Sequence, residues 1–562
     1  MTRNVRNNTA VNITRFSLLG LFLLFSVWSS AQLKQSQIDQ IDDLFSSWNS
    51  PGHPGGAIGI MHQGKVVYSK AFGLASLEYL VPNSPGTIFN TGSVSKQFTA
   101  MGIVRLEEQG LLSFDDDIRK HIPELPDFGE VITIRHLLHH TSGLRSLHAL
   151  FALAGWRGDD FRSNDDLNRI ILDQKDLNFK PGDEFLYCNT GYMLMVNIIE
   201  NTTGEKFPSW MTENIFQPLG MIDTYTEDQY DRIVPNNATS YYAGQKFTRA
   251  IEYWGYVGSG NMHSTTGDLL RWLSYFHTPV EGWEDAFQTL QTTDPLNDGG
   301  INNYAFGVNV FEENGRTKVQ HGGSVGGFRA YAGTYPDEQL SIVVLTNFSN
   351  GNAGGKANDI SGILLDDIDE NDDSVVDIET IEMSVEELDA FKGTYWNAKE
   401  KYQRRINVWK DTLWYVRTLT NQTPLLAVDD NTFKMSGVDV DVTVRFISSG
   451  EDQQMTVQIA NESPSVFDKK EKPALNEDEL DTYVGTFYST ELKTAYTITV
   501  DGRKIRASHI RHGEIPLQRI FPDVMTGDWP LSTIEFKRDE SGNVDGIYIS
   551  NGRVRNAWFE KQ

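Results

Sequence analysis

The feature that most constrains the fold is a repeat in the last third of the chain. The segment Glu-Leu-Asp-Ala-Phe-Lys-Gly-Thr-Tyr at 387–395 returns as Glu-Leu-Asp-Thr-Tyr-Val-Gly-Thr-Phe at 479–487. Each copy is followed by short runs of alternating apolar and polar residues separated by turns, which is typical of small antiparallel barrels. Two copies at so long a spacing indicate duplicated domains and not a solenoid. We therefore expect two small antiparallel β-barrel domains, at 385–470 and 475–562.

The residues before the repeat predict a larger domain of mixed structure. At 562 residues the chain is too long for a single core. Near its start, 57–71 reads as a β-hairpin, and strand patterns return between 304 and 347, the first of them at 304–311. Helical patterns fill the middle, and 358–368 closes the segment as a helix. This order predicts an α+β fold over 32–365, an antiparallel sheet built from both ends and flanked by helices.

An acidic run separates this domain from the barrels. It reads Asp-Asp-Ile-Asp-Glu-Asn-Asp-Asp at 366–373. A calcium loop is one interpretation of this run, but the fixed glycine and terminal glutamate of an EF-hand are missing. Because blocks of like charge repel and stay extended, we expect a solvated acidic linker over 366–384.

The N-terminus has the pattern of an export signal. Three arginines precede an apolar run at 16–28, and Ser29-Ser30-Ala31 places small residues at a cleavage point. The run is shorter than the roughly 20 residues of a membrane span. We expect a signal peptide over 1–31, cleaved after Ala31, and a periplasmic or secreted protein; an uncleaved anchor is the alternative. With Cys188 as its single cysteine, the chain forms no internal disulfide.

The overall charge limits the classes of molecule that the protein is expected to bind. The formal net charge is −27. Phosphate binding requires basic patches, so this charge argues against nucleic acids and against anionic membrane surfaces as partners. We expect a small-molecule or peptide substrate, no nucleic acid, and no membrane contact beyond export.

Ser93-Val94-Ser95-Lys96 is the first candidate for chemistry. It precedes a run of helix-forming residues that stops near Gly110, which predicts a helix of about four turns beginning at Ser93. Residues three apart share a helix face, so the Ser93 hydroxyl lies beside the Lys96 amine. The free N–H groups of a helix N-terminus stabilise a developing oxyanion. The pattern suits a nucleophile with an adjacent base, although S-x-x-K alone is common by chance.

The second candidate is Tyr187-Cys188-Asn189. A phenol with a pKa near 10 is a poor base unless a cation holds it ionised, and Lys96 is a candidate for that cation. Asn189 is placed to hold Lys96 or a substrate amide. Taken alone, the segment is more typical of a packed tyrosine followed by a turn asparagine.

The third candidate is the glycine-rich segment at 321–328, which begins with His321. Glycines such as Gly323 allow a backbone to approach a ligand closely. At a strand edge, the Ser324 N–H is a candidate second oxyanion donor beside the Ser93 N–H. His321 is a candidate donor to the substrate or to Tyr187.

Ser324 also lies in a G-x-S-x-G pattern, and this offers an alternative nucleophile. In hydrolases with this pattern the serine lies on a tight strand-to-helix turn called the nucleophile elbow. Such an elbow requires a helix directly after the serine and a histidine later in the chain. The following residues, 328–335, read as a strand, and the only later histidines are His509 and His512 in the second repeat. We therefore do not expect Ser324 to be the nucleophile.

Two further groups of residues are candidate sites. The histidines His136, His139 and His140 are spaced to share a helix face, which could suggest zinc. No acidic or fourth ligand is spaced with them, so core and capping roles are expected. Cys188 has no histidine beside it in sequence and is a poor candidate nucleophile.

Taken together and in this order, Ser93-x-x-Lys96, Tyr187-x-Asn189 and His321-x-Gly323 resemble the motifs of the serine beta-lactamase-like hydrolases. That family includes class C beta-lactamases, DD-peptidases, D-aminopeptidases and related esterases. The resemblance covers about residues 36–368, and supporting stretches stand at 136–144, 218–221 and 258–262. The two C-terminal barrels resemble, more weakly, the arrangement in D-aminopeptidases, where such domains flank the active site.

The resemblance implies a role for each matched residue. Ser93 is acylated, Lys96 and Tyr187 share the base role in acylation, and Tyr187 helps to activate water. Asn189 positions the substrate, and the Ser93 and Ser324 amides form the oxyanion hole. The chain departs from the pattern at Cys188, where a small Ser or Ala is usual, and at His321, where beta-lactamases have a lysine. A mostly neutral histidine favours substrates with no carboxylate at that position.

We therefore expect an exported serine hydrolase that works through an acyl-enzyme on Ser93, without metal or cofactor. It would cleave amide or ester bonds in D-amino acid peptides or small esters, with peptidoglycan fragments among the candidate substrates. Beta-lactamase or DD-carboxypeptidase activity is one alternative. A non-catalytic cell-wall ligand-binding protein on the same scaffold is another.

Overall fold

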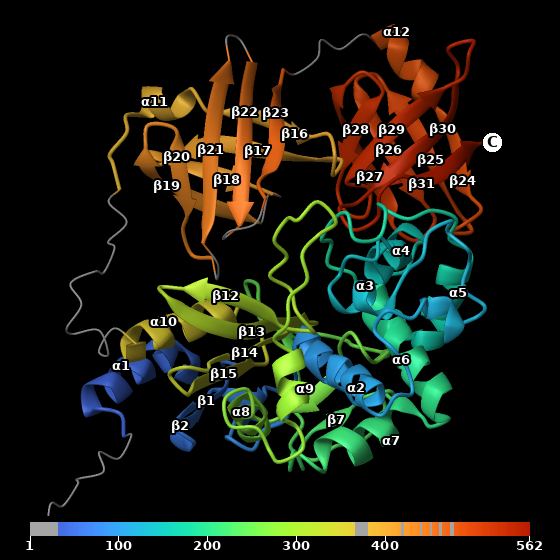
Figure 1. Cartoon of the computed structure of the whole chain (residues 1–562). Coiled ribbons are helices and arrows are strands. Elements are labelled where there is room, and N and C mark those ends of the chain that lie inside the picture. The colour runs from blue at the N-terminus through green and yellow to red at the C-terminus, as the bar shows by residue number, and fades with distance from the viewer. Residues whose placement is uncertain are drawn as a thin grey trace, which may run out of the picture.

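The computed structural model describes residues 32–365, 380–417, 421–438, 441–449, 452–459, 463–471 and 477–562. The expected signal peptide at 1–31 and the acidic run at 366–373 lie outside these ranges. The expected fold class is confirmed: an α+β domain with an antiparallel sheet is followed by two closed barrels (Figure 1). Within the described ranges, no helix has the length and apolar character needed to cross a membrane.

The sheet of the α+β domain joins the two ends of that domain. Its six strands lie in the order β12-β13-β14-β15-β1-β2, and every pairing is antiparallel. The first hairpin meets the last strand, with Gly56 opposite Thr346 and His62 opposite Leu340. The strands are β1 (Gly56–His62), β2 (Lys65–Phe72), β12 (Asn309–Glu313), β13 (Arg316–Val325), β14 (Phe328–Tyr335) and β15 (Leu340–Thr346).

Helices cover both faces of this sheet. Ile58 and Ile60 of β1 pack on one face of the sheet against α1 and α10. Ala57, on the opposite face, packs in the core of the helical middle of the domain. This alternation follows the two-residue period of a strand. The helices are α1 (Gln35–Phe45), α2 (Lys96–Glu108), α3 (Ile134–Leu138), α4 (Leu147–Leu153), α5 (Asn164–Leu172), α6 (Asn189–Thr203), α7 (Phe207–Met211), α8 (Thr266–Ser274), α9 (Glu284–Thr289) and α10 (Ala353–Leu365).

Short elements connect these layers. The helical turns are η1 (Ser46–Asn49), η2 (Gly92–Ser95), η3 (Ile118–Lys120) and η4 (Thr212–Phe216). The minor strands are β3 (Leu74–Ser76), β4 (Val81–Pro82), β5 (Phe89–Asn90), β6 (Arg162–Ser163), β7 (Tyr225–Thr226), β8 (Tyr241–Tyr242), β9 (Thr248–Arg249), β10 (Trp254–Gly255) and β11 (Met262–Ser264).

One expected strand is shorter in the structure. The pattern at 304–311 predicted a strand, but β12 begins only at Asn309. Gly307 adopts a φ of +78° and turns the chain before the strand. The turn leaves Tyr304 buried, with its hydroxyl beside the candidate site.

The repeated segments begin two closed eight-stranded barrels. Barrel 1 follows α11 (Val385–Asp389) and comprises β16 (Gly393–Asn397), β17 (Tyr402–Trp409), β18 (Thr412–Val416), β19 (Gln422–Asp429), β20 (Thr432–Met435), β21 (Val442–Ser449), β22 (Asp452–Ile459) and β23 (Ser465–Lys470). Barrel 2 follows α12 (Glu477–Leu480) and η6 (Asp481–Tyr483) and comprises β24 (Gly485–Ser489), β25 (Thr494–Asp501), β26 (Lys504–His509), β27 (Gly513–Phe521), β28 (Val524–Gly527), β29 (Thr533–Arg538), β30 (Val544–Ser550) and β31 (Ala557–Lys561).

Helix α4 docks barrel 2 onto the α+β domain. Leu147 and Phe151 belong to the core of that domain, whereas Ala149, Leu150 and Leu153 pack into the core of barrel 2. Figure 1 shows the barrel resting on α4. One short helix thus serves two cores, and the apolar contact holds the barrel as a fixed part of the molecule.

A buried ion pair joins the same two parts. Arg145 Nη1 lies 2.7 Å from Glu491 Oε2 of barrel 2, and both side chains are almost completely buried. The guanidinium also donates to Gln174 Oε1 and to the Asn556 carbonyl. Gln174 and the Asn556 carbonyl accept hydrogen bonds but carry no charge. Glu491 is therefore the group that balances the buried positive charge of Arg145.

Replacing Glu491 by glutamine is expected to lower the unfolding free energy by about 3–5 kcal/mol, because the Arg145 charge stays buried without its counter-ion. Urea titration would measure the change. Lys493→Gln is the matched control, since it breaks the exposed Lys493–Asp173 pair of the same interface and should cost about 1 kcal/mol or less. Equal losses in the two variants would contradict a special role for the buried pair.

Candidate active site

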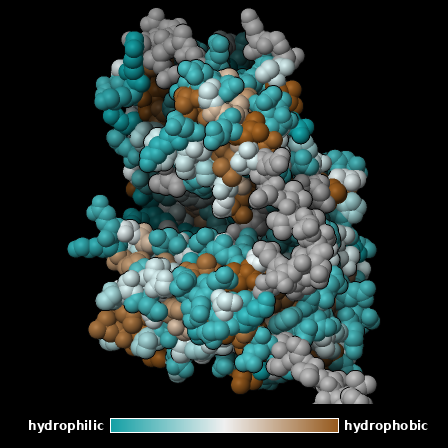
Figure 2. All heavy atoms as spheres, turned by 90° about the vertical axis from the view of Figure 1, so that its left-hand side faces the viewer, coloured by the Kyte–Doolittle hydropathy of each residue, from teal (hydrophilic) through white to brown (hydrophobic). Residues whose placement is uncertain are grey.

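The Ser93 side chain lies at the floor of a large cavity between the α+β domain and the two barrels. Ser93 belongs to η2, which leads directly into α2, so it occupies the N-terminal turn expected from the sequence. The cavity has a volume of about 1370 Å³ and is lined by residues of all three parts, including Gln422 of barrel 1 and Arg553 of barrel 2. Figure 2 shows the surface hollowed between barrel 1 and the α+β domain.

Lys96 lies directly beside Ser93. Its Nζ is 3.2 Å from Ser93 Oγ and donates to the Ser259 carbonyl at 2.6 Å. The side chain is fully buried, and no carboxylate of the described residues pairs with it. Burial, aided by the positive charge of Arg553, holds the pKa of Lys96 well below its usual range. A lowered pKa favours a neutral amine, which is the state that accepts a proton.

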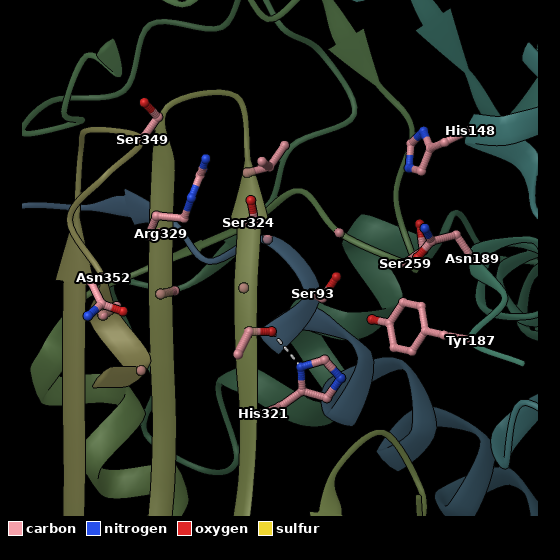
Figure 3. A pocket seen from close by; sticks show the side chains of 18 of the residues that line it. Ser93, His148, Tyr187, Asn189, Ser259, His321, Ser324, Arg329, Ser349 and Asn352 are labelled. Atoms are coloured by element: carbon pink, nitrogen blue, oxygen red, sulfur yellow. Dashed lines mark hydrogen bonds between the residues drawn. The ribbon is translucent and has the colours of Figure 1, made fainter. Parts of the chain in front are cut away.

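Tyr187 faces Ser93 from the other side. Figure 3 shows the Tyr187 hydroxyl directed toward the segment that carries Ser93. Lys96 Nζ is 4.8 Å from the centre of the Tyr187 ring. The Tyr187 hydroxyl is buried and makes no hydrogen bond within the described chain. Burial raises the pKa of Tyr187 above its usual value. The electrostatics therefore differ from the expectation that a lysine cation holds Tyr187 ionised: the phenol keeps its proton.

Asn189 begins α6 and completes this side of the cavity. Its backbone N–H donates to Ser146 Oγ at 3.3 Å, and its side chain lines the cavity near Ser259 (Figure 3). The Lys96 amine is bound by the Ser259 carbonyl and not by Asn189. Of the two roles considered for Asn189, contact with substrate is therefore the one that its position favours.

His321 lies on β13 and lines the cavity together with Ser93. Its Nδ1 donates to the Gly322 carbonyl at 2.6 Å (Figure 3), so Nε2 accepts from the Tyr304 hydroxyl at 3.0 Å. Burial lowers the pKa of His321 to about 3, and the ring is neutral. Both ring nitrogens have partners other than Tyr187, so the expected donation to Tyr187 is not seen, whereas donation to a substrate stays a prediction.

The free edge of β13 supplies the candidate oxyanion hole. Strand β12 pairs only with 316–320, so the rest of β13 has an open edge toward η2. A Cβ added to Gly92 would lie 2.7 Å from the Ser324 nitrogen, which places that amide against the turn carrying Ser93. The two backbone N–H groups expected from the sequence, of Ser93 and Ser324, therefore lie on adjoining segments.

Gly323→Ala is expected to lower kcat by about 100-fold, the effect of losing one oxyanion donor. A Cβ at Gly323 would collide with the Thr91 carbonyl and push β13 away from η2. Gly322→Ala is the matched control, because its Cβ meets only the Ala330 carbonyl, at 3.9 Å. Steady-state kinetics with one ester substrate would compare the two variants. Similar losses in both would show that the close approach of β13 to η2 does not matter.

The structure around Ser324 lacks the strand-to-helix turn that a nucleophile elbow requires. Ser324 lies within β13, and the residues after it turn into β14 instead of a helix. The later histidines have partners elsewhere: His509 Nε2 lies 2.7 Å from Thr494 Oγ1, and His512 Nε2 lies 2.7 Å from the Ala152 carbonyl. What the structure shows for Ser324 is a backbone nitrogen that lies against the turn carrying Ser93.

The three clustered histidines have separate structural partners. His136 caps α3, with Nδ1 accepting from Thr133 N at 3.1 Å. His139 ends that helix, and Nδ1 lies 2.8 Å from the Tyr304 carbonyl. His140, at φ +59°, accepts from Cys188 N at 3.1 Å and packs against Tyr187. Across the described ranges, no group of three His, Cys, Asp or Glu side chains is arranged to hold a metal.

The structure adds residues that local patterns did not predict. His148 of α4 and Tyr256 line the cavity, Tyr304 supports His321, and Arg553 enters from the loop after β30. Arg553 Cζ is 4.9 Å from the centre of the Tyr187 ring. These positions depend on long-range packing, and the only sequence signal was the barrel repeat that brings Arg553 into the cavity wall.

Comparison with known proteins gives consistent matches. The family model described as Beta-lactamase matches residues 38–365. Penicillin-binding protein 4* of Bacillus subtilis is 29% identical over 338 residues, 56% of this chain and 73% of that protein. D-aminopeptidase of Gluconobacter oxydans is 27% identical over 299 residues, 53% of this chain and 56% of that protein. This chain thus spans little more than half of that enzyme.

Among solved structures, the octameric penicillin-binding protein homologue from Pyrococcus abyssi has a TM-score of 0.55 and 25% sequence identity. The match covers 77% of this chain and 99% of that one. The similarity therefore extends over most of the present fold.

Proposed function

Because the chain belongs to the Beta-lactamase family, we propose that it is a serine hydrolase that cleaves amide or ester bonds through an acyl-enzyme on Ser93. The resemblance drawn from the three motifs is confirmed by this membership. One observation carries the proposal: a fully buried lysine amine with a lowered pKa lies 3.2 Å from an accessible serine hydroxyl at the floor of a cavity. Such a pair is the arrangement of a nucleophile with its base.

Acylation follows from this geometry. The neutral Lys96 amine takes the Ser93 proton as Oγ attacks the substrate carbonyl carbon. The resulting oxyanion is stabilised by the backbone N–H groups of Ser93 and Ser324. The proton then passes to the leaving nitrogen or oxygen, with the protonated phenol of Tyr187 as the relay, and the carbon–leaving-group bond breaks. An ester on Ser93 and a free amine or alcohol result.

Deacylation reverses the proton transfers with water. Lys96, again neutral after the leaving group is protonated, accepts a proton from a water molecule through the Tyr187 hydroxyl. The hydroxide formed attacks the ester carbon, and the same two N–H groups bind the oxyanion. Collapse releases a carboxylic acid and restores the Ser93 hydroxyl. The net reaction consumes one water for each bond cleaved.

The proposed substrates are D-amino acid peptides or small esters. The similarity to a D-aminopeptidase supports the peptide class, and the wide cavity accommodates an extended substrate. We also propose that the protein acts after export to the periplasm or outside the cell, since residues 1–31 have the composition of a signal peptide.

Labelling with a serine-reactive fluorophosphonate, followed by peptide mapping, tests the proposal. A single adduct on Ser93 is expected, together with hydrolysis of esters or D-amino acid amides from a substrate panel. The same reagent must label a known serine hydrolase in parallel. An adduct on Ser324, or no adduct with the control labelled, would reject Ser93 as the nucleophile and favour the elbow or the binding-protein alternative.

A further inference from the structure

The charge of the cavity is opposite to that of the chain. The protein has a formal net charge of −27. The described residues that line the cavity nevertheless include no aspartate or glutamate, and they include two arginines, Arg329 and Arg553. A cation-lined recess in a strongly acidic protein concentrates anionic ligands, because the low-dielectric walls focus the field.

The two arginines differ in what they already bind. Arg329 donates from Nη1 to the carbonyls of Gly326 and Phe328, at 3.1 and 2.6 Å. The Arg553 guanidinium packs over the Tyr187 ring and has no hydrogen-bond or ion-pair partner within the described chain. Packing on a ring uses the face of the guanidinium and leaves its five N–H donors free in the plane.

The backbone around Arg553 is fixed. The Arg553 carbonyl accepts from Ser146 N at 3.0 Å and from Asn178 Nδ2 at 3.2 Å. Arg555 N donates to Asn178 Oδ1 at 2.7 Å, and the Arg555 guanidinium binds Glu184 Oε2 at 3.0 Å. The α+β domain therefore holds the loop of barrel 2 at Arg553 itself and at Arg555, which reduces the entropy lost when the Arg553 side chain binds a ligand.

We propose that Arg553 binds a carboxylate of the substrate, so that the enzyme prefers acyl compounds with a free carboxylate near the bond it cleaves. The guanidinium fork matches a carboxylate in two parallel hydrogen bonds. Arg553 thus supplies from barrel 2 the fixed charge that the neutral His321 does not supply from β13. The inference rests on the proposed hydrolysis at Ser93 and adds the substrate class.

Matched substrate pairs test this assignment. The pairs are 3-acetoxybenzoate with 3-acetoxybenzamide, mono-4-nitrophenyl succinate with its succinamate, and N-acetyl-D-alanyl-D-alanine with its C-terminal amide. The ratio of kcat/KM for acid over amide should fall by about 10- to 100-fold in Arg553→Gln for at least one pair, the value of a charge-assisted contact. Arg553→Lys should restore part of the ratio, because it keeps the charge without the fork.

Arg511→Gln is the matched control for charge. Arg511 belongs to barrel 2 and pairs with Asp160 at the same interface, but it does not line the cavity. Its substitution should leave the acid-to-amide ratio as in the wild type. An equal fall of the ratio in both variants would assign the effect to net charge or docking and overturn the inference.

The pH dependence of kcat/KM in Arg553→Gln is a further measurement, and a merely structural role of Arg553 would leave it unchanged. Arg553 helps to lower the pKa of Lys96, so its removal should shift the acidic limb of kcat/KM to higher pH with the amide substrates. If hydrolysis depends on Ser93 but the acid-to-amide ratios of kcat/KM are unchanged in Arg553→Gln, the carboxylate contact of Arg553 is rejected while the proposed function stands. Absence of Ser93-dependent hydrolysis of every probe would reject the proposed function itself.

Discussion

Replacing Ser93 by alanine is expected to lower kcat by about 10⁴- to 10⁶-fold, as for other serine nucleophiles. The side chain is partly exposed at the cavity floor and makes no contact that the fold depends on beyond Lys96, so the variant should fold normally. Its affinity for a substrate should be little changed, because Arg553 and the β13 edge remain in place. Calorimetric titration with a substrate that is now stable would measure that affinity.

Ser324→Ala is the comparison that makes this result specific. It keeps the backbone N–H that is proposed to bind the oxyanion and removes only the side chain hydroxyl, so the loss of kcat should be far smaller than in Ser93→Ala. The opposite order, with Ser324→Ala the more damaging, would establish the elbow serine as the nucleophile. A Ser93→Ala variant that still turns over substrate would exclude the acyl-enzyme route.

Replacing Lys96 by methionine is expected to lower kcat by about 1000-fold, within the range for loss of a general base. Methionine fills a similar volume, so Ser93 keeps its position while losing the amine that accepts its proton. Lys206→Met, at an exposed position, is the control for loss of a lysine and should keep wild-type kinetics. Comparable losses in Tyr187→Phe and Lys96→Met would assign the base role to the pair and not to Lys96 alone.

The same substitution should raise stability. Because the folded-state pKa of Lys96 lies below 10.5, the unfolded chain binds a proton more readily than the folded chain at neutral pH. Lys96 therefore opposes folding, and its contribution becomes less unfavourable as the pH rises toward 10.5. Urea titrations at pH 7 and pH 10 should show the Lys96→Met gain shrinking with pH; a gain that grows would mean that Lys96 is buried as a cation.

The local parts of the fold could be predicted from the sequence. Gly110 marks the end of the Ser93 helix, and α2 does end at Glu108, with Gly110 following at φ +70°. The first hairpin and both barrels also follow from patterns that act over short distances. These features depend on turn chemistry and side-chain periodicity, which are visible in one chain without knowledge of its neighbours.

The electrostatic state of the site could not be predicted in the same way. The shifts of Lys96 and Tyr187 arise from complete burial, which depends on how distant segments close over them. The orientation of His321 follows from Tyr304, which the chain turn at Gly307 brings beside it. The motif spacing identified which side chains meet; only packing decides which of them carries a proton.

The position of Arg553 in the cavity wall has a consequence for the order of biosynthesis. The ribosome completes the segment with Ser93 and Lys96 long before it reaches barrel 2. Until barrel 2 follows, Arg145 lacks its counter-ion Glu491 and one face of α4 lacks its apolar cover. A product cut short before barrel 2 would therefore lose the proposed carboxylate contact and part of its stability together, so the same late segment completes both the cavity wall and the fold.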